Sequence, residues 1–558
     1  MSAIVVLLAG LAIMAAGYLV YSRFVAGRIL RLDPNFVTPA HELEDGVDYV
    51  PTSRFVLWGH HFTSVAGAAP IVGPAIAVIW GWVPAFLWVA FGTVFFAGVH
   101  DMTAMWASVR NKARSIGAVT GDVVGRRART LFMIVIFLVL LMVNAVFAVV
   151  IANLLIANPT AVVPVWGAIA VALVIGQLIY RRRMGLLGVS IAGVVALYAL
   201  IGLGPLMPVE LPSSVLGLPP AAQWIVLLFA YAAVASLLPV WVLLQPRDYI
   251  NGLQLFIGLG LLYLAILIAN PTIVAPAFNA DAPAGTPSFI PLLFVTIACG
   301  AISGFHGLVS SGTTSKQVSK ETDVRFVGYF GAVGEGCLAL AAILAATAGF
   351  ATIGEWREVY SAFGQGGVNA FVAGGAAIVA AGTGLPEIVA VTLLTVMAVL
   401  FAGTTMDTGV RLQRYIIQEW GAIYDIPALR GVGVSTLVAI AACVALAFGA
   451  GGIGGTGGML IWPLFGTTNQ LLAGLTLLVV TVMLARMGRP TWITLIPLTF
   501  LLTMTILALL VQLVQFWNAG DWFLLGLDVV ILIAAVMVLL ESVSALRVAR
   551  AGAVRPAE

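Results

Sequence analysis

Apolar stretches long enough to cross a lipid bilayer follow one another along almost the whole chain, separated by short polar segments. A membrane-spanning helix needs about 20 mostly apolar residues. The pattern predicts fifteen spans, at residues 3–26, 57–80, 83–109, 131–156, 161–180, 187–205, 222–244, 248–270, 290–311, 326–349, 386–408, 431–450, 459–485, 491–516 and 522–545. A further apolar segment, 367–382, is short and rich in Gly and Ala, so we expect a re-entrant or surface piece there.

The composition points to lipid as the solvent of this chain. Of its 558 residues, 61% are hydrophobic and only 9% are charged, whereas soluble domains carry about 25% charged residues. The net charge of +3 is small and gives no indication of nucleic-acid binding. We therefore expect an all-α polytopic protein whose partner is the lipid bilayer.

The basic residues are distributed unequally between the two faces that the spans define. Of the 26 Lys and Arg residues, 25 fall on one face, and Arg357 alone falls on the other. The positive-inside rule assigns the basic face to the cytoplasm. This places the N-terminus outside the cell and the C-terminus in the cytoplasm.

Two spans contain residues that interrupt helices. The second span holds Gly67-Ala68-Ala69-Pro70, followed by Gly73-Pro74, and the seventh span holds "SLLPVW" at 236–241. Non-helical backbone at membrane depth is tolerated only where it is buried in protein or lines a cavity. The alternative is that Gly and Pro are simply common in membrane helices, and for the seventh span a plain proline kink explains the pattern equally well.

These two interruptions are five spans apart and lie in helices of opposite direction. Interrupted helices at corresponding positions of inverted repeats are typical of secondary transporters. The pattern divides the chain into a first helix and cytoplasmic loop (1–56), a five-helix repeat (57–210), an inverted five-helix repeat (211–410) and accessory helices (411–558).

Several segments closely resemble the carbon starvation protein A (CstA) family. They are "PAHELEDGVDYVPTSRFVLWGHHFTSVAGAAPIVGP", "GVHDM", "LPVWVLLQPRDYIN", "SGFHGLVSSGTTSKQ", "TTMDTGVRLQRY" and "LFGTTNQLLA". The resemblance implies a transporter of the cytoplasmic (inner) membrane for pyruvate or short peptides, with proton symport for pyruvate, and a LeuT-like fold of two inverted five-helix repeats. One departure is Ala69, which stands where the family often has glycine.

Ionisable residues inside spans are costly and are therefore candidates for function. Asp101, His306 and Glu335 lie within the third, ninth and tenth spans, and His60 and His61 lie near the start of the second. A histidine titrates near neutral pH, which suits a proton shuttle. Static hydrogen-bonded pairs are the alternative.

Serines surround His306 along the ninth span. Ser303 lies one turn before it, and Ser310 and Ser311 lie one turn after it, so we expect a polar stripe on one helix face. Such hydroxyl groups suit a sodium ion, whereas the histidine suits a proton. Hydrogen bonds within the helix are the alternative.

The positive end of a half-helix attracts a carboxylate. We expect the outer half of the second span to begin near residues 71–73 and to hold the substrate through its backbone N–H groups. The residues predicted to surround the substrate are Phe62, Gly67, Ala68, Ala69, Ile71, Val72, Gly73, Ser236, Pro239, Trp241 and Phe305.

Two charged pairs are predicted at the cytoplasmic ends of spans. Arg247 and Asp248 follow the seventh span, where they could lock an inner gate or cap the next helix. Asp407 and Arg411 are four residues apart in the eleventh span, which favours an ion pair along the helix.

The function predicted from these features is secondary active transport of a small carboxylate or short peptide, coupled to H⁺ or Na⁺. Two other functions remain alternatives: a passive solute channel, and an intramembrane metalloenzyme using His60, His61, Asp101 and His306. Helical spacing does not support a shared metal site for these four residues. We expect no cofactor, no metal and no enzymatic activity.

Overall fold

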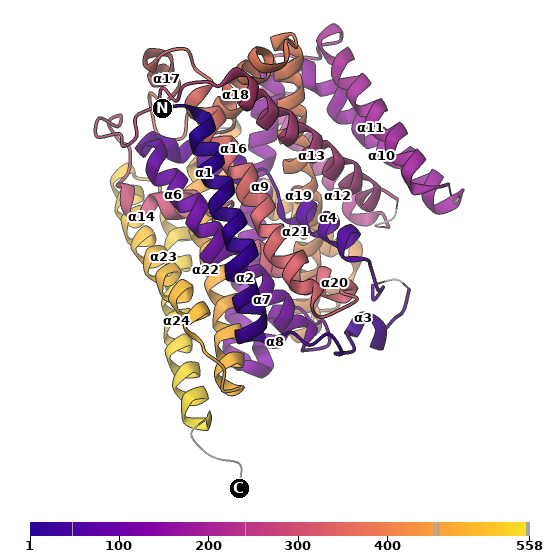
Figure 1. Cartoon of the computed structure of the whole chain (residues 1–558), viewed down its shortest axis with the longest axis vertical. Coiled ribbons are helices and arrows are strands. Elements are labelled where there is room, and N and C mark those ends of the chain that lie inside the picture. Colours follow the sequence, from indigo (N-terminus) through magenta and orange to yellow (C-terminus); the bar gives the residue numbers. More distant parts are fainter. Residues whose placement is uncertain (47, 183, 240–241, 451, 455–456, 554–558) are drawn as a thin grey trace.

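The computed structural model describes residues 1–558 except 47, 183, 240–241, 451, 455–456 and 554–558. The described residues contain helices and three isolated bridges but no strand. Thirteen helical segments are long and apolar enough to span a membrane, and one bent pair brings the number to fourteen. The predicted all-α polytopic fold is confirmed, and the N-terminus and the last described helix, α24 (Trp522–Ala553), end at opposite ends of the bundle (Figure 1).

The helices follow the predicted spans closely, with a few short π and 3₁₀ segments in line with them. The long helices are α1 (Ala3–Ala16) with η1 (Gly17–Tyr21), α2 (Ser22–Phe24) and η2 (Val25–Leu30), α6 (Trp82–Gly92) with η4 (Thr93–Ala97) and α7 (Gly98–Val109), α9 (Arg126–Ala157), α10 (Val162–Gly176) with η6 (Gln177–Arg181), α11 (Leu186–Leu203), α12 (Pro220–Leu237), α13 (Leu244–Ala269), η9 (Arg325–Tyr329) with α16 (Phe330–Ala348), α19 (Glu387–Ile423), α21 (Val432–Gly449), α22 (Gly457–Arg486), α23 (Trp492–Ala519) and α24 (Trp522–Ala553). Shorter helices connect them: α3 (Pro39–Glu42), α8 (Ile116–Val123), η5 (Pro159–Ala161), η7 (Gly204–Leu206), η8 (Thr314–Gln317), α17 (Ile353–Val359), α18 (Gly367–Thr383), α20 (Pro427–Arg430) and η10 (Gly452–Gly454).

The predicted interruption of the second span is confirmed. Helix α4 (Arg54–Val65) ends before α5 (Ala69–Ala77, continued by η3, Val78–Trp80), and the two halves are bent by 52°. Pro70 lies in the first turn of α5, where its missing N–H costs nothing. The outer half begins earlier than predicted, because the N–H groups of Ile71 and Val72 already bond to the carbonyl of Ala68 at 3.0 Å.

The predicted interruption within the seventh span is wrong. Helix α12 ends at Leu237, so Ser236 is in its last turn and Pro239 follows the helix. Trp241 lies outside the described residues. Proline lacks the N–H needed to continue a helix, so "SLLPVW" marks the end of a span.

Two arginines of α19 complete this helix end. Arg411 donates to the carbonyls of Ala235 and Leu238, at 2.8 and 2.6 Å, and Arg414 donates to the carbonyl of Ser236 at 2.8 Å. The last carbonyls of a helix have no partners within the helix and carry partial negative charge. The arginines therefore explain how α12 ends inside the protein.

The second interruption lies instead in the predicted ninth span, at 290–311. This segment is not one helix but two, α14 (Phe289–Thr296) and α15 (Gly304–Gly312). Gly300 has φ of +91°, a backbone conformation that favours glycine, and Ser303 is extended. The residues between the two helices were hidden from the prediction because their side chains are as apolar as a continuous span.

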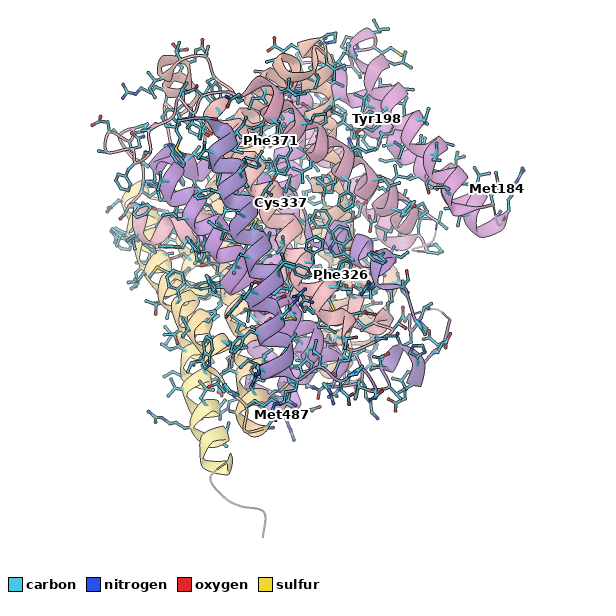
Figure 2. The ribbon with its side chains drawn as sticks, in the orientation of Figure 1. Met184, Tyr198, Phe326, Cys337, Phe371 and Met487 are labelled. Carbon is cyan, nitrogen blue, oxygen red and sulfur yellow. The ribbon has the colours of Figure 1, made fainter. Side chains whose placement is uncertain are left out.

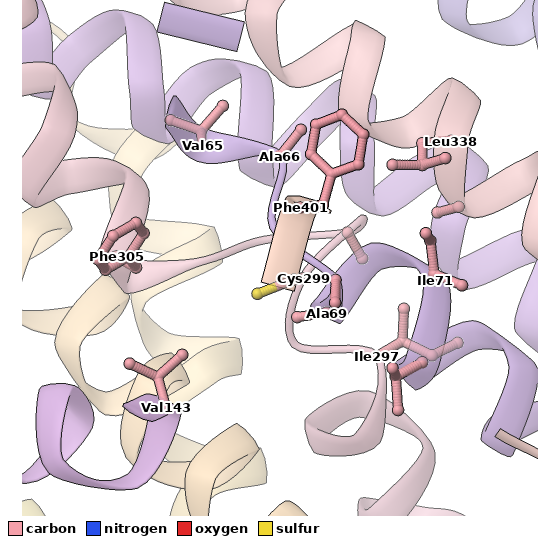
Figure 3. Packing of buried hydrophobic residues seen from close by; sticks show 14 of the residues in the cluster. Val65, Ala66, Ala69, Ile71, Val143, Ile297, Cys299, Phe305, Leu338 and Phe401 are labelled. Atoms are coloured by element: carbon pink, nitrogen blue, oxygen red, sulfur yellow. The ribbon is translucent and has the colours of Figure 1, made fainter. Parts of the chain in front are cut away.

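The two interruptions pack directly against each other. A Cβ atom added to Gly73 would lie 2.5 Å from the carbonyl oxygen of Thr296, so only glycine permits this approach. Figure 3 shows Ala66 and Ala69 of the first interruption beside Ile297 and Cys299 of the second. All four residues are buried. The bundle therefore has one central region where two helices change direction together.

The hairpin formed by α10 and α11 accounts for the spacing of the two interruptions. It lies at the edge of the bundle in Figure 1, with Met184 at its outer tip in Figure 2. In the chain it falls between α9 and α12, and it adds two spans between the interrupted helices. The short apolar segment predicted at 367–382 forms α18, which packs against α13, α16 and α19.

Replacing Gly73 by alanine is expected to destabilise the protein, because the new methyl group must push α5 away from Thr296. Overfilling a packed core costs about 1–3 kcal/mol. Thermal unfolding in detergent measures this, with Gly260→Ala in α13 as the control, since a Cβ there meets open space. Equal melting temperatures for both variants would contradict close packing of the interruptions.

Candidate functional site

A histidine between two carboxylates lies beside the second interruption. His306 of α15 places its Nδ1 2.9 Å from Oδ2 of Asp101 on α7, and its Nε2 3.0 Å from Oε2 of Glu335 on α16. The first contact is a hydrogen bond, and the second has ion-pair distance without the alignment of a hydrogen bond. All three side chains have zero exposure. Sequence reasoning selected each residue separately, and the structure brings them together.

His100 extends this cluster and was missed by the sequence prediction. Its Nδ1 lies 2.8 Å from Oδ1 of Asp101, so the Asp101 carboxylate is held between two imidazoles. Nε2 of His100 has no partner among the described residues. The motif "GVHDM" contains both residues, but neighbouring helix positions point about 100° apart, so their pairing was not expected.

Ionisable side chains of the cluster connect α7, α15 and α16, and all of them are fully buried. Burying unpaired charge is costly, so two carboxylates and an imidazole in contact must carry at least one proton to limit their net charge. Gaining or losing a proton therefore changes how strongly α15 is attracted to α7 and α16. This arrangement can store a proton and respond mechanically to its release.

The adjacent histidines His60 and His61 diverge, as their helix positions predict. His61 is fully buried and places its Nδ1 3.0 Å from Oγ1 of Thr314, and His60 is half-buried. The His61 ring lies against Gly331 of α16, where a Cβ would approach it within 2.7 Å. His61 therefore contacts α16, which also carries Glu335, and η8, the short helix that follows α15.

The serines do not form the predicted stripe. Ser303 precedes α15 with extended backbone, so it does not share a helix face with His306. Ser311 donates to the carbonyl of Gly307 at 2.6 Å. The Ser310 hydroxyl has no partner among the described residues. The stripe prediction failed because it assumed that the helix continues through residue 303.

Two adjacent residues of α22 hold the second interruption in place. Asn469 accepts from the N–H of Phe305 at 3.0 Å and donates to the Ser303 hydroxyl at 3.1 Å. Gln470 donates to the carbonyl of Phe294 at 2.5 Å. One residue therefore caps the start of α15, and the next caps the end of α14. They were missed although "LFGTTNQLLA" contains both.

Side chains of the first repeat and α22 bind the carbonyls between α14 and α15. Trp462 donates to Thr296, and Trp88 donates to Ile297, both at 3.3 Å. The Thr93 hydroxyl donates to the carbonyl of Gly300 at 2.9 Å, completing this set. Buried peptide groups need such partners because lipid supplies none.

The first interruption has fewer polar partners. A Cβ on Gly67 would lie 2.6 Å from the Thr405 hydroxyl and 3.3 Å from the Phe147 ring. The N-cap residue Ala68 has no polar side chain, and within the described part of the chain no side chain accepts a hydrogen bond from the N–H groups that begin α5. Helix N-termini carry partial positive charge and attract anions. Since Asn469 already occupies the start of α15, the start of α5 is the freer position for a carboxylate.

The predicted aromatic walls have different surroundings. Phe305 is buried beside the second interruption, as Figure 3 shows. Phe62 stacks on Trp58, with ring centroids 5.7 Å apart and an interplanar angle of 4°, and it also contacts Phe256. This places Phe62 in an aromatic cluster one turn before the first interruption.

The predicted ion pair between Asp407 and Arg411 is wrong. Asp407 forms a buried ion pair with Arg247 of α13, and it accepts a hydrogen bond of 2.8 Å from Tyr231 of α12. Arg411 is engaged by the end of α12 instead. Asp248 is also buried, and its Oδ1 has no partner among the described residues.

This ion pair does not face the interruptions. Thr405, which contacts Gly67, and Asp407 are two residues apart on α19, so their side chains point about 200° apart. The pair therefore joins α12, α13 and α19 on the far side of α19. Among the residues that the structure describes, no group of three or more His, Cys, Asp or Glu side chains is placed to hold a metal ion.

Two interrupted helices that meet in mid-bundle, next to a buried titratable cluster, define a multi-pass membrane protein of the LeuT-like fold, an arrangement typical of secondary transporters. The overall architecture is similar to that of a manganese transporter from Eremococcus coleocola, with a TM-score of 0.54 and 13% sequence identity. The similarity covers 91% of this chain and 99% of that chain. At this identity the similarity establishes the fold alone.

The family is established by sequence. The model of the family "Carbon starvation protein CstA" matches residues 2–354 and 351–508. A peptide transporter CstA from Campylobacter jejuni is 34% identical over 567 residues, covering 90% of this chain and 79% of that protein. The pyruvate/proton symporter BtsT from Escherichia coli (strain K12) is 32% identical over 591 residues, covering 91% and 81%.

The chain therefore belongs to the CstA family. The family and the relatives indicate a membrane transporter and not an enzyme.

Replacing Asn469 by leucine is expected to lower the stability of the protein by about 1–3 kcal/mol, because the buried N–H of Phe305 loses its acceptor. Thermal unfolding in detergent measures the effect. Thr468→Val is the matched control, since that hydroxyl bonds only to the Leu464 carbonyl within α22. An equal melting temperature for both variants would show that Asn469 does not hold the interruption.

Replacing Asp407 by leucine is expected to destabilise the protein by about 3–5 kcal/mol, because Arg247 is left buried without its counter-charge. The double variant Arg247→Met, Asp407→Leu should recover most of this loss. Asp122→Ala, which removes an exposed ion pair with Arg114, should cost less than about 1 kcal/mol. A double variant as unstable as the single one would exclude the unpaired arginine as the cause.

Proposed function

We propose that the protein is a proton-coupled importer of a small carboxylate such as pyruvate, or of short peptides, which works by alternating access around its two interrupted helices. The relatives named as peptide transporters and as a pyruvate/proton symporter support both substrate classes. The distribution of basic residues supports a cytoplasmic-membrane location with the N-terminus outside and the C-terminus inside.

The placement of His306 between Asp101 and Glu335 is the observation that carries this proposal. His306 is the third residue of α15, so it moves with the half-helix that borders the central region. A proton on His306 attracts both carboxylates, and its loss weakens both contacts. Protonation therefore shifts the population between arrangements of α15, which is the basis of coupling. Na⁺ is the alternative coupling ion, and His60, His61, Ser303, Ser310 and Ser311 remain predicted coupling residues.

We place the substrate carboxylate at the uncapped start of α5, near Gly67, Ala68 and Ala69. Pro70 contributes no N–H, and Ile71 and Val72 already use theirs, so the donors shift toward Ala68 and Ala69. Thr405 and Phe147 border this position at Gly67, and Phe305 remains a predicted substrate-binding residue. Gly73 instead serves the packing of the two interruptions.

The predicted boundary between the two repeats at residue 210 remains a prediction. The position of the second interruption, between α14 and α15, favours a different boundary. A first repeat would comprise α4/α5, α6–α7, α9, α12 and α13, with α10 and α11 inserted. The inverted repeat would comprise α14/α15, η9–α16, α19, α21 and α22. This division gives both repeats an interrupted first helix.

The gate assigned to Arg247, Asp248, Asp407 and Arg411 is retained as part of the proposal. The ion pair of Arg247 with Asp407 fixes α13 to α19, and Arg411 fixes α19 to the end of α12. Because these contacts connect α12, α13 and α19, a movement of α13 relative to α19 must break the ion pair between Arg247 and Asp407. They would control movement of a helix rather than touch the substrate.

The decisive experiment is uptake of labelled pyruvate and dialanine into proteoliposomes under an imposed proton or sodium gradient. His306→Gln and Asp101→Asn are expected to lose accumulation at least about tenfold, because a single 1.4 kcal/mol change in coupling has that effect. Both variants should retain counterflow exchange, which needs no gradient. His41→Gln, which changes an exposed histidine, should behave like the unaltered protein.

Accumulation by either variant at the level of the unaltered protein would contradict the coupling role. Failure of the unaltered protein to accumulate either solute under both gradients would overturn the proposed function. Downhill flux that ignores every gradient would indicate a channel.

A further inference from the structure

A cavity of about 230 Å³ lies apart from the cluster and the interruptions. The connection between α13 and α14 forms one side, with Asn279, Asp281 and Pro283. Helix α17 and the turn after it form the other, with Trp356, Arg357 and Tyr360. Helix α17 and the N-terminus lie at the same end of the bundle in Figure 1, which we have proposed to face outside.

Two opposite charges line this cavity and are free to bind a ligand. Arg357 and Asp281 are both exposed. Neither forms an ion pair within 4 Å with any group in the described part of the chain. Arg357 is also the single Lys or Arg that the predicted spans place on this face. A lone cation on an otherwise uncharged or acidic face attracts carboxylates that approach from that side.

The floor of the cavity is aromatic and rigid. The rings of Trp356 and Tyr360 are stacked, with centroids 4.7 Å apart and an interplanar angle of 21°, and both residues are buried. Trp356 donates to the carbonyl of Ala346 at 3.2 Å. Because both rings are almost fully enclosed, they stabilise the cavity lining and leave Arg357 and Asp281 as its charged contacts for a ligand.

The cavity walls are bonded to the outer half of the second span. The Tyr360 hydroxyl donates to the carbonyl of Ala75 in α5 at 2.6 Å. Asn279 donates to the carbonyl of Ile79 at 2.8 Å through its side chain. A ligand in the cavity therefore contacts side chains that hold α5, the helix at whose start we place the substrate carboxylate.

We propose that this cavity is an outer binding site for a short zwitterionic peptide, with Arg357 binding its carboxylate and Asp281 its ammonium group. The inference rests on the proposed function and narrows its substrate class. Pyruvate has a carboxylate but no ammonium group, so it engages only one of the two charges. Exposed ion pairs are worth at most about 1 kcal/mol. The site therefore binds its ligand weakly, and it binds zwitterionic peptides more tightly than simple carboxylates because peptides engage both charges.

The test compares the KM and kcat of dialanine and N-acetylalanine uptake in Arg357→Gln and Asp281→Asn. Arg357→Gln should raise the KM for both solutes about two- to fivefold with kcat unchanged, since both carry a carboxylate. Asp281→Asn should raise the KM for dialanine alone. Glu358→Gln, a neighbouring charge outside the cavity lining, is the matched control and should change neither value.

An unchanged KM for dialanine in both variants would overturn the site. A fall in kcat at constant KM would assign the residues to structure and would overturn it as well. An equal rise for N-acetylalanine in Asp281→Asn would refute recognition of the ammonium group. Equilibrium binding of dialanine to the purified variants, which needs no gradient, tests the site even where proton-driven accumulation fails.

Discussion

The structure depends on the requirement that peptide groups released from a helix inside lipid must find partners in the protein. At the second interruption these partners come from α22 and from the continuous α6–η4 helix. Asn469 and Gln470 of α22 cap the two helix ends, and the carbonyls between them bind Trp88, Thr93 and Trp462. The sequence predicts α22 as an accessory helix. In the structure its side chains instead bind the facing ends of α14 and α15 and so stabilise the interruption between them.

The two interruptions differ in whether a side chain caps the start of the helix that follows. The start of α15 is already capped by Asn469, whereas α5 starts without any side-chain cap. The acid–histidine cluster lies next to α15, and the uncapped helix start belongs to α5. Under the proposed function, the coupling ion and the substrate lie at different half-helices, and the contact between Gly73 and Thr296 joins these two half-helices.

Sequence patterns were sufficient for features that depend on local chemistry. Apolar length predicted the spans, and Gly67 with Pro70 predicted the first interruption, because both residues act on their own helix. The second interruption was missed because residues 297–302 have apolar side chains or none, and their backbone is stabilised by side chains from distant segments. Pro239, which follows the end of α12, is a strong local indication of an interruption in the sequence. The interruption between α14 and α15 has no such local indication, because side chains of other helices stabilise it.

In the candidate site, too, the sequence predicted individual residues but not the contacts between distant segments. Costly intramembrane charges identified Asp101, His306 and Glu335 individually, but their contacts cross three helices and follow from packing alone. The Asp407 partner was mistaken because a pair within one helix is the nearest possibility in sequence. Arg411 instead meets carbonyls that only the folded bundle brings to it.

The hairpin of α10 and α11 makes the two halves of the bundle unequal in their contact with lipid. It adds exposed apolar surface, including Leu187, Ile191 and Val195, to one half. A transmembrane surface must match the thickness of the hydrocarbon around it, at a cost of fractions of a kcal/mol per ångström of mismatch. The half that carries the hairpin therefore presents a larger lipid-facing surface whose height must match the hydrocarbon thickness than the other half does.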